Sequence, residues 1–421
     1  MRNVDVVIVG AGAAGLGAYM GLEESGLSVL LVEARSRIGG RALTRCVGGK
    51  IAFDVGCEWL HSADTNLFVQ IAKQLQYEIG EAPPHWGEQT FDVNFSRDEQ
   101  RQFRVASDAF YERLELAAER PYDSVASDCL EPGNRWNPLI DAVSSYVNGT
   151  ELRRASAHDL NSYADSFLDW RVRQGYGALI AAHGKGCRVA LDTEVRSIAH
   201  GGHEIELDTS RGTLRARRLV YTLPTSLTAE EAVRFLPALP DKTAAAAGLP
   251  LGHAEKVLLA IDRPEIFPEE GHLFGRIDRA ATGSYDLRPL GQPCIEAFFG
   301  GSLACELEAA GQLASFAIDE LVAVLGSDFR KQVRPLAASS WARDPHAKGS
   351  YSHALPGHRQ DRATLAAPVA GRLFFAGEAT SQKLFSTAHG AYETGLRAAS
   401  EVAHSMTHSP RSVALKKEKL R

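Results

Sequence analysis

The stretch Val4–Gly15, VDVVIVGAGAAG, decides the fold that this chain is expected to adopt. Its β-branched run predicts a buried strand, the Ala-rich residues that follow predict a helix, and Ser28–Val32 predicts a second apolar strand. Gly10 permits a tight turn, Gly12 lets a pyrophosphate approach the backbone, and Gly15 lets the helix pack closely on the strand. The stretch therefore predicts a βαβ unit that binds a dinucleotide at the N-terminus of its helix.

An acidic residue and a basic stretch follow the second strand. Glu33 comes 18 residues after Gly15, where its carboxylate can accept hydrogen bonds from both ribose hydroxyls and would repel a 2′-phosphate. The stretch Arg35–Arg41, RSRIGGR, adds three cations and two glycines. These suit a second close approach to a diphosphate, with Arg41 as its charge partner. A glycine-rich turn followed by a surface glutamate is the alternative interpretation.

The composition of the whole chain is that of a soluble globular protein. Hydrophobic residues make up 44% and charged residues 23% of the 421 positions, so the chain can bury the cores of two or three domains. A net charge of -6 argues against nucleic acid or an anionic membrane as the main partner. The six cysteines form no CxxC pair, so no metal site is predicted, and no apolar stretch is long enough for a membrane span. We expect a cytoplasmic protein, because the N-terminus runs directly into a strand.

Hydrophobic periodicity predicts further elements along the chain. Residues 64–182 should be mainly helical, with one helix behind an Asp64-Thr65 cap and a longer amphipathic helix over Arg97–Arg120. Strands are predicted at Arg188–Leu191, Glu204–Asp208, Thr213–Thr222, Val257–Ile261, Cys294–Phe299, Leu336–Trp341 and Arg372–Ala376. Helices are predicted at Leu313–Leu325 and His389–Met406.

The residues from Val4 to Thr44 resemble the N-terminal signature of FAD-dependent amine oxidases and their wider relatives, in which VExxxRxGGR follows the glycine fingerprint. Protoporphyrinogen oxidases, carotenoid desaturases and L-amino-acid oxidases share this signature. The resemblance therefore implies FAD as the cofactor without defining the reaction. It also implies an α/β (α+β) chain, in which a Rossmann-like FAD-binding domain of the GR2 type carries an inserted substrate domain of mixed sheet and helices.

Asp54–His61, DVGCEWLH, resembles the DxGAxWIHG segment of polyamine oxidases, with Ser62 in place of the usual glycine. The resemblance implies that this backbone lies along the flavin ring and that His61 faces the substrate. A structural histidine satisfied by its neighbours is the alternative.

Gly252–Leu258, GHAEKVL, resembles the segment that carries the flavin-side lysine of the family. In the relatives this lysine, Lys256 here, hydrogen-bonds a water that contacts flavin N5, the atom that accepts the hydride. A buried ammonium group would also favour the anionic reduced flavin. The alternative is an edge-strand lysine whose ammonium group extends to solvent.

Trp341–Ser352, WARDPHAKGSYS, closely resembles the WxxDPxxxGSYS pattern of polyamine oxidases and histone lysine demethylases. The resemblance implies that Trp341 packs on the flavin and that Tyr351 forms one wall of an aromatic cage for the amine. Ser350 stands where monoamine oxidases have a cysteine that bonds the flavin, so noncovalent FAD is expected.

Two C-terminal segments, FFAGEAT and STAHGAY, resemble the elements that close the FAD site of the family. By this resemblance, Glu378 hydrogen-bonds the ribityl and phosphate region, and the helix that begins near Ala388 directs its N–H groups at the flavin pyrimidine. Thr387 replaces the second cage tyrosine of monoamine oxidases, which leaves Phe385 or Phe298 as candidates to complete the cage.

These resemblances define the predicted site and domains. Catalytic roles are expected for Lys256, Tyr351, Trp341 and His61. Cofactor contacts are expected at Gly10, Gly12, Ala14, Gly15, Glu33, Ala34, Arg35, Gly40, Arg41, Gly56, Cys57, Glu58, Trp59, Val195, Trp341, Gly377, Glu378, Thr387 and Ala388. The FAD-binding domain is predicted over residues 1–64, 183–245 and 337–408, the substrate domain over residues 65–182 and 246–336, and a flexible basic tail over residues 409–421.

The expected function is oxidation of a primary or secondary amine of the polyamine type, by hydride transfer to flavin N5. The products would be an imine or aldehyde and hydrogen peroxide formed from molecular oxygen. Candidate carboxylates for the charges of a polyamine are Glu58, Glu296 and Glu393, with ordinary surface positions as the alternative. Another possibility is an L-amino-acid oxidase or other flavin oxidoreductase of the superfamily. The amino-acid oxidase requires an arginine for the substrate carboxylate, and the arginines considered are Arg153, Arg171 and Arg343. A catalytically weak flavin-bound interaction protein remains a further hypothesis, and a monomer or homodimer is expected.

Overall fold

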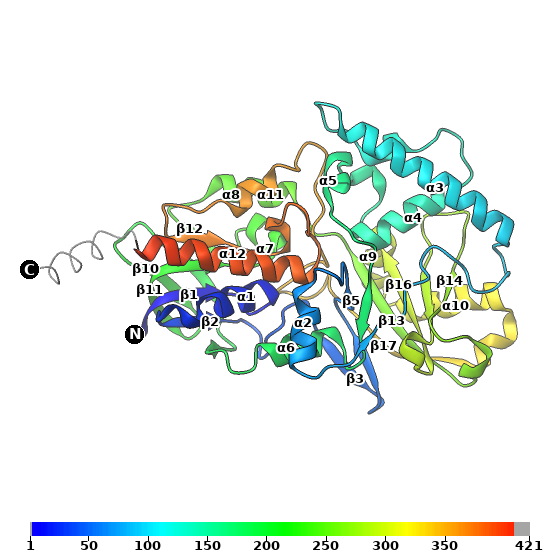
Figure 1. Ribbon diagram of the computed structural model, residues 1–421, viewed down its shortest axis with the longest axis horizontal. Helices are drawn as coiled ribbons and strands as arrows, with labels where there is room; N and C mark the ends of the chain where they lie inside the picture. Colours follow the sequence, from blue (N-terminus) through cyan, green and yellow to red (C-terminus); the bar gives the residue numbers. More distant parts are fainter. Residues whose placement is uncertain (1, 408–421) are drawn as a thin grey trace, which may run out of the picture. The chain divides into compact units, whose positions relative to one another are not determined.

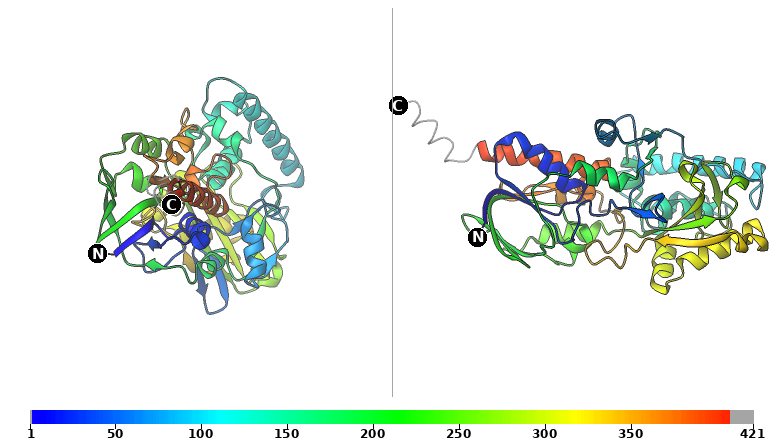
Figure 2. Two further views of the ribbon diagram at one scale, coloured as in Figure 1. Left: turned by 60° about the vertical axis from the view of Figure 1, so that its left-hand side comes forward. Right: turned by 90° about the horizontal axis from the view of Figure 1, so that it is seen from below.

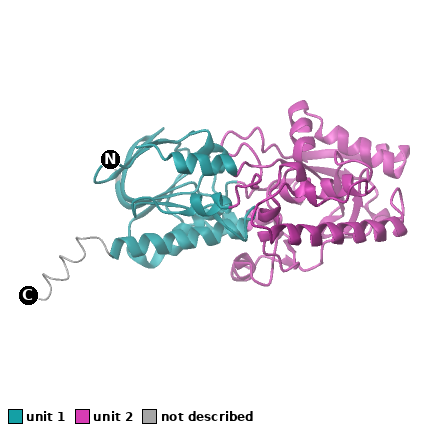
Figure 3. Cartoon of the chain, turned by 90° about the horizontal axis from the view of Figure 1, so that it is seen from above, with its two compact units in different colours: residues 1–40, 180–248, 360–421 teal, residues 41–179, 249–359 magenta. Residues whose placement is uncertain are grey.

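The computed structural model describes residues 2–407, which divide into two compact units (Figure 3). Unit 1 comprises residues 1–40, 180–248 and 360–421, and unit 2 comprises residues 41–179 and 249–359. Each unit is therefore built from segments that lie far apart in the sequence.

An eight-stranded sheet forms the centre of unit 1 (Figure 1). Its strands are β1 (Arg2–Val9), β2 (Val29–Val32), β8 (Val189–Ala190), β9 (Val195–Ala199), β10 (Ile205–Thr209), β11 (Gly212–Tyr221), β12 (Arg234–Leu236) and β18 (Leu373–Phe375). Their order is β12-β9-β10-β11-β1-β2-β8, and β18 pairs with β11. β1 runs parallel to β2 and β11, with Val9 opposite Val32 and Tyr221. The carboxyl ends of these three strands therefore meet at one edge, where Gly10 begins the turn into the first helix.

The helices of unit 1 are α1 (Ala13–Leu22), α7 (Thr225–Ala229), α8 (Pro240–Gly248), α11 (Asp361–Ala366) and α12 (Ala388–Thr407). α1 and α12 come from opposite ends of the sequence and lie side by side (Figures 1 and 2). A Cβ at Gly17 would lie 2.2 Å from the carbonyl oxygen of Tyr392, and one at Gly395 would lie 2.1 Å from that of Ala14. Small residues on both helices therefore allow backbone to pack directly against backbone.

A five-stranded sheet, in the order β14-β15-β16-β13-β17, organises much of unit 2. Its strands are β13 (Ala254–Ile261), β14 (Gly271–Phe274), β15 (Ser284–Leu287), β16 (Cys294–Gly300) and β17 (Val333–Ala338). Alternate residues such as Val257, Leu259 and Ile295 join an apolar core with helix residues including Leu321. Because side chains alternate between the faces of a strand, the intervening residues, among them Lys256, lie on the opposite face.

Unit 2 also contains two smaller sheets, one with β3 (Thr44–Val47) and β4 (Ile51–Asp54), and one with β5 (Trp59–Leu60), β6 (Ile79–Gly80) and β7 (Trp170–Val172). Its helices are α2 (Leu67–Gln74), α3 (Arg97–Ala118), α4 (Asn137–Asn148), α5 (Ala157–Ser162), α9 (Gly301–Ala310) and α10 (Leu313–Leu325), and α6 (Tyr176–His183) starts in this unit. The 3₁₀ helices of both units are η1 (Glu23–Ser25), η2 (Ala126–Cys129), η3 (Leu152–Arg154), η4 (Pro264–Ile266), η5 (Pro289–Gly291), η6 (Ser327–Lys331) and η7 (Glu378–Thr380). α3 begins with a capping box between Ser96 and Glu99, which explains why the helix starts at the predicted residue.

The predicted βαβ opening is confirmed, and so is the helix at Leu313–Leu325. Two local predictions were wrong. The side chain that caps α2 is Asn66, which accepts a hydrogen bond from the Phe68 N–H, and not the Asp64-Thr65 pair. The predicted strand Leu336–Trp341 instead runs from Val333 to Ala338, so Trp341 lies in the loop that follows. The helical block predicted over residues 64–182 also contains β6 and β7, because strands this short leave little periodicity in the sequence.

The compact units differ from the predicted domains at two long segments and, by three residues each, at the boundaries 180–182 and 246–248, which belong to unit 1. Residues 41–64 and 337–359 were assigned to the FAD-binding domain, but they pack within unit 2. The prediction grouped residues by expected cofactor contact, whereas the units reflect packing of the chain on itself, so the functional division stays a prediction. The predicted tail, residues 409–421, lies outside the described residues. In residues 2–407, every helix is too short or too polar to cross a lipid bilayer.

Candidate active site

The glycine turn of unit 1 has the geometry of a dinucleotide site. Gly10 has φ +99°, and a Cβ at Gly15 would lie 1.9 Å from the Gly10 carbonyl oxygen, so both glycines are required by the turn itself. Glu33, at the end of β2, is buried and accepts hydrogen bonds from the N–H groups of Ala11 and Arg35, both at 2.9 Å. Its carboxylate is therefore fixed beside the turn, where the sequence predicted a ribose.

The N-terminus of α1 offers the free donors that a diphosphate needs. Gly12 is the N-cap residue, the helix has no side-chain cap, and its first turn contains no acidic residue. A Cβ added at Gly12 would meet its nearest neighbour, the Cα of Gly40, only at 3.8 Å. The backbone is thus open above Gly12, and the N–H groups of the first turn can bind an anion there. The residues present fit the diphosphate of a dinucleotide.

The start of α12 in unit 1 is organised by the predicted C-terminal segment. Thr387 caps the helix, because its Oγ1 accepts a hydrogen bond from the Gly390 N–H at 3.0 Å. The buried Glu378 accepts a hydrogen bond from the Ser386 N–H at 3.1 Å, and the Gly377 N–H donates to Thr394 at 2.9 Å. Thr387 therefore has a structural role, and a contact with the cofactor from this segment stays a prediction.

In unit 2, Asp54 fixes the start of the segment Asp54–Trp59. Its carboxylate accepts hydrogen bonds from the N–H groups of Tyr176 and Gly177, at 2.8 and 3.0 Å, and from the Thr44 hydroxyl at 2.5 Å. The first two bonds satisfy the N-terminus of α6. Burial raises the pKa of Asp54 to about 6, although these hydrogen bonds favour the ionised form.

Gly56 is required by a close contact within the protein. A Cβ at this position would lie 1.7 Å from the Arg41 carbonyl oxygen and 3.2 Å from the ring of Trp341. Arg41 also donates a hydrogen bond to the Ser350 carbonyl oxygen at 2.5 Å. The lack of a side chain at Gly56 therefore lets three predicted site segments pack together, in addition to any contact that the glycine makes with a cofactor.

Trp341 is buried and held at two atoms. Its indole Nε1–H donates to the Val55 carbonyl oxygen at 2.8 Å, and its backbone N–H donates to Glu255 at 2.7 Å. Glu255 is fully buried and also accepts a hydrogen bond from the Ser339 hydroxyl. Burial raises the pKa of Glu255 to about 7. The sequence did not identify this residue, although it directly precedes Lys256.

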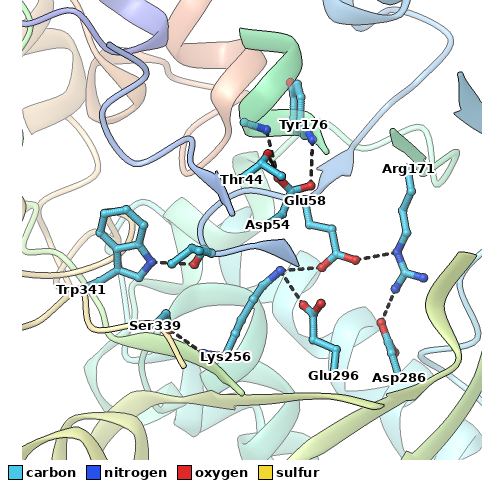
Figure 4. Close-up of polar contacts among 12 residues, drawn as sticks. Thr44, Asp54, Glu58, Arg171, Tyr176, Lys256, Asp286, Glu296, Ser339 and Trp341 are labelled. Carbon is cyan, nitrogen blue, oxygen red and sulfur yellow. Dashed lines mark hydrogen bonds and ion pairs between the residues drawn. The ribbon is translucent and has the colours of Figure 1, made fainter. Parts of the chain in front are cut away.

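Lys256 is a buried residue of a central strand, since β13 lies between β16 and β17. The edge-strand interpretation of this lysine was therefore wrong. Its ammonium group lies 2.5 Å from Glu58 Oε2 and 2.7 Å from Glu296 Oε1 (Figure 4). Burial opposes the charged form, but Glu296 and Glu58 outweigh this effect and raise the pKa of Lys256. The ammonium group is thus charged at neutral pH.

The two carboxylates belong to a larger buried network (Figure 4). Glu58 Oε1 lies 2.8 Å from Nε of Arg171, which also forms ion pairs with Glu270, at 2.7 Å, and with Asp286. Burial and the charge of Glu58 raise the pKa of Glu296 well above its usual range. By contrast, the charges of Lys256 and Arg171 overcome burial and lower the pKa of Glu58. The two directions differ because Glu58 pairs with two cations, Lys256 and Arg171, whereas Glu296 pairs with Lys256 alone.

These contacts correct the interpretation of Glu58 and Glu296 as ordinary surface residues, because both are largely buried and paired. Neither carboxylate is free to bind a polyamine charge. The third candidate, Glu393, is half-buried on α12 of unit 1, and burial raises its pKa. The sequence suggested Arg171 only as one of three arginines considered for a substrate carboxylate. Its position could not be predicted, because its partners lie far away in the chain.

Tyr351 is fixed by its hydroxyl group, which donates to the Tyr146 carbonyl oxygen at 2.5 Å. Phe298 lies next to these residues, since its ring centroid is 6.3 Å from that of Tyr146 and 5.9 Å from the Lys256 ammonium nitrogen. The other cage candidate, Phe385, belongs to unit 1 and packs under the Arg362 guanidinium group. Phe298 is therefore the candidate that unit 2 brings close to Lys256 and to Tyr146, the hydrogen-bond partner of Tyr351.

His61 is oriented by a buried carboxylate. Its Nδ1 lies 2.8 Å from Asp169 Oδ1, and its side chain is 34% exposed. The ring centroid of Trp86 lies 6.0 Å from His61 and 4.7 Å from Trp59, whose face is covered by Arg171. The contact with Asp169 supports the structural alternative for His61, but it uses only Nδ1. Because the ring is partly exposed, Nε2 can still contact a ligand.

The predicted site residues divide between the units. Unit 1 holds Gly10, Gly12, Ala14, Gly15, Glu33, Ala34, Arg35, Gly40, Val195, Gly377, Glu378, Thr387 and Ala388. Unit 2 holds Arg41, Gly56, Cys57, Glu58, Trp59, His61, Lys256, Trp341 and Tyr351. Within the described chain, no group of three or more histidine, cysteine, aspartate or glutamate side chains is placed to bind a metal ion.

The open glycine turn, the parallel strands and Glu33 define a dinucleotide-binding α/β protein. Residues 13–403 match the family model for flavin containing amine oxidoreductases, and the chain belongs to this family. The dinucleotide is therefore FAD, bound noncovalently. The Ser350 hydroxyl, at the position of the linking cysteine, instead exchanges hydrogen bonds with the backbone of Ala254.

Individual relatives are distant but cover almost the whole chain. Polyamine oxidase 2 of Arabidopsis thaliana is 27% identical over 95% of this chain and 88% of that protein. Lysine-specific histone demethylase 1 homolog 2 of Arabidopsis thaliana is 28% identical over 95% of this chain, which spans only 58% of that protein. The solved structure of cyclohexylamine oxidase from Brevibacterium oxydans IH-35A has a TM-score of 0.76 at 22% identity and covers 97% of this chain and 100% of that chain. This likeness confirms the predicted fold class.

Proposed function

We propose that this protein is an FAD-dependent oxidase of primary or secondary amines, which produces an imine and hydrogen peroxide. The observation that carries the proposal is the buried Lys256 on an interior strand of the five-stranded sheet, in the segment that resembles the flavin-side lysine segment of amine oxidases. When bound, FAD supplies the hydride acceptor, and the side chains need only bind, orient and adjust protons. The imine would then hydrolyse to an aldehyde.

The aromatic residues of unit 2 suit the binding of an amine. The Tyr351 hydroxyl group is fixed by its hydrogen bond to the Tyr146 carbonyl oxygen, and the Phe298 ring packs beside the Tyr146 ring. Such walls contact the carbon atoms of an amine and exclude water, which favours the uncharged amine from which hydride can leave. Lys256 lies at the same place and provides the fixed positive charge that stabilises negative charge developed in the reaction.

We favour substrates with one charged group. Long polyamines need carboxylates that are free to pair with several ammonium groups, whereas Glu58 and Glu296 already pair with Lys256 and Arg171. The names of similar proteins include polyamine oxidases, a putrescine oxidase and a cyclohexylamine oxidase, so the fold itself is compatible with several kinds of amine.

The alternatives receive less support from the site. An L-amino-acid oxidase needs an arginine for the substrate carboxylate, but Arg171 is saturated by three carboxylates, and Arg153 and Arg343 are exposed. A flavin-bound interaction protein without activity leaves the buried Lys256 unexplained, because a buried ion pair generally stabilises a fold no more than well-packed apolar side chains would.

The experiment is to purify the protein with its flavin and to measure hydrogen peroxide with monoamines, putrescine, spermidine, spermine and L-amino acids. We expect turnover with at least one alkyl or cyclic monoamine and a faster rate than with spermine. Flavin-loaded protein that oxidises none of these amines would contradict the proposal, and turnover of amino acids alone would favour the second candidate.

A further inference from the structure

Glu58 and Glu296 both pair with the Lys256 ammonium group, although the proposed reaction does not require two carboxylates there. A lysine beside a flavin needs at most one carboxylate to balance its charge. Here two carboxylates lie within 2.7 Å of the same nitrogen, and all three side chains are at most 10% exposed. If both carboxylates were ionised, the three groups would carry a net negative charge in a buried place, which is unfavourable without a further proton.

The groups around Glu296 show where this proton resides. The charged and titratable groups that face Glu296 are Glu58, Lys256, Arg171, Asp286 and the thiol of Cys294. Arg171 is engaged by Glu58, Glu270 and Asp286, so its charge is already balanced before Glu296 is counted. Only Lys256 remains for Glu296, and Lys256 is shared with Glu58. Glu296 therefore has no arginine partner and only a share of one ammonium group. Burial and the Glu58 charge raise its pKa well above the usual range, whereas the pKa values of Glu270 and Asp286, which pair with Arg171, are raised less, so Glu296 holds the proton.

We propose that Glu296 is a proton store for the reaction and that Lys256 passes its proton to reduced oxygen. The inference rests on the proposed function, because it assumes that an amine is oxidised with oxygen as the acceptor. Glu296 acts through Lys256 and not through a contact with substrate or cofactor, so it is a positioning residue.

The atoms and electrons of the reaction require such a proton. Hydrogen peroxide forms from oxygen, two electrons and two protons. The hydride taken from the amine provides two electrons and one proton, so one more proton must come from elsewhere. Lys256 breaks an N–H bond to give this proton to oxygen, and the Glu296 carboxyl group breaks its O–H bond to restore the ammonium group. Glu296 is then a carboxylate.

The next substrate refills the store. An alkylammonium ion must lose one proton before hydride can leave, and the vacant Glu296 carboxylate accepts this proton through the same path. One ammonium ion and one oxygen molecule thus give one protonated imine and one hydrogen peroxide molecule, with no net proton taken from solvent. A cavity of about 20 Å³, lined by Glu58, Glu296 and Gln292, has room for roughly one water molecule beside the pair. Gln292, which lines this cavity, has a buried Oε1 atom without a hydrogen-bond partner among the described residues, and a water molecule could satisfy it.

The first test reads the proton directly, on the protein without flavin or substrate. Infrared spectra of the wild-type protein at pH 8.5, where Glu255 with its pKa of about 7 is ionised, should contain the carbonyl stretch of a protonated carboxyl group that shifts in heavy water. Glu296→Gln should remove this band, and the matched control Glu270→Gln, which breaks an ion pair with Arg171 but does not touch Lys256, should retain it. A wild-type spectrum without the band overturns the proposal even if the variant does not fold.

The second test uses the flavin-loaded enzyme and separates the two half-reactions in a stopped-flow instrument. Glu296→Gln should slow reoxidation by oxygen about 10- to 100-fold, less than the roughly 10²- to 10⁴-fold typical of a lost general acid, because Glu296 acts through Lys256. Reduction by amine at high pH, where the amine is already neutral, should change less than about threefold. An unchanged reoxidation rate overturns the proposal that Glu296 supplies the proton through Lys256. Wild-type protein that shows the infrared band but oxidises no amine instead contradicts the proposed function.

Discussion

Glu255 accepts a hydrogen bond from the backbone N–H of Trp341 at 2.7 Å, and so connects the Trp341 loop to the strand residue next to Lys256. Side chains alternate along β13, so Glu255 and Lys256 lie on opposite faces of the same strand. The carboxylate that positions the tryptophan and the ammonium group bracketed by Glu58 and Glu296 are therefore fixed by one piece of backbone. The effect of a substitution at Glu255 can therefore be compared with that of a substitution at Lys256 on the same strand.

Glu255 should make the stability of the protein depend on pH. Burial raises its pKa from 4.5 to about 7, so the folded state binds the proton more tightly than the unfolded chain. The resulting stabilisation is fully present below pH 4.5 and is lost as the pH rises through about 7. Relative to Glu255→Gln, the wild type should lose roughly 2 to 4 kcal/mol of unfolding free energy over this window.

The measurement is urea unfolding of both proteins without flavin at several pH values between 4.5 and 8. The variant Glu194→Gln, which changes an exposed carboxylate, is the control and should follow the wild type. A constant difference between the wild type and Glu255→Gln would show that Glu255 does not titrate in this range.

Trp341→Phe should destabilise unit 2 while leaving an aromatic ring in place. The change removes the indole donor and leaves the buried Val55 carbonyl oxygen without its partner, at a cost of about 1 to 3 kcal/mol. Trp86→Phe is the control, because Trp86 is 38% exposed and should cost less than about 1 kcal/mol. Equal losses in the two variants, measured by urea unfolding, would contradict a specific role of the indole N–H.

The dinucleotide-binding part of this fold could be predicted because its determinants are local. The β-branched run, the spaced glycines and Glu33 all lie within the first 33 residues, and each restricts backbone or packing by itself. The same is true of α3, whose first turn carries its own capping box. Such features need no knowledge of the rest of the chain.

The charge network could not be predicted in the same way. Glu58, Arg171 and Glu296 come from three distant segments, and only the assembled sheets show that they meet. The position of β13 between β16 and β17 is equally non-local, and it decided that Lys256 is not an edge residue. Asp169 was missed for the same reason, since nothing near it in the sequence indicates His61 as its partner.

Lys256→Met should separate the catalytic use of the lysine from its structural use. Without the ammonium group, Glu58 and Glu296 face one another in a buried place, so the unfolding free energy should fall by about 3 to 5 kcal/mol. The double variant Lys256→Met with Glu58→Gln removes one of these carboxylates and should recover part of the stability. Both variants should be slow in flavin reduction or reoxidation. Full activity of the stable double variant would show that the lysine has no role in the reaction.

Two neighbouring glycines should respond in opposite ways to the same substitution. Gly15→Ala places a methyl group 1.9 Å from the Gly10 carbonyl oxygen, so α1 must move and the protein without flavin should lose at least about 2 kcal/mol of stability. Gly12 has φ -77°, which alanine adopts readily. The methyl group of Gly12→Ala would meet its nearest neighbour, the Cα of Gly40, only at 3.8 Å. Its stability should change by less than about 1 kcal/mol, but FAD affinity should fall at least tenfold, because the methyl group occupies the space through which the diphosphate approaches. Thermal unfolding of the protein without flavin and titration with FAD measure the two effects separately. Tight FAD binding by Gly12→Ala would mean that the diphosphate does not lie over this turn.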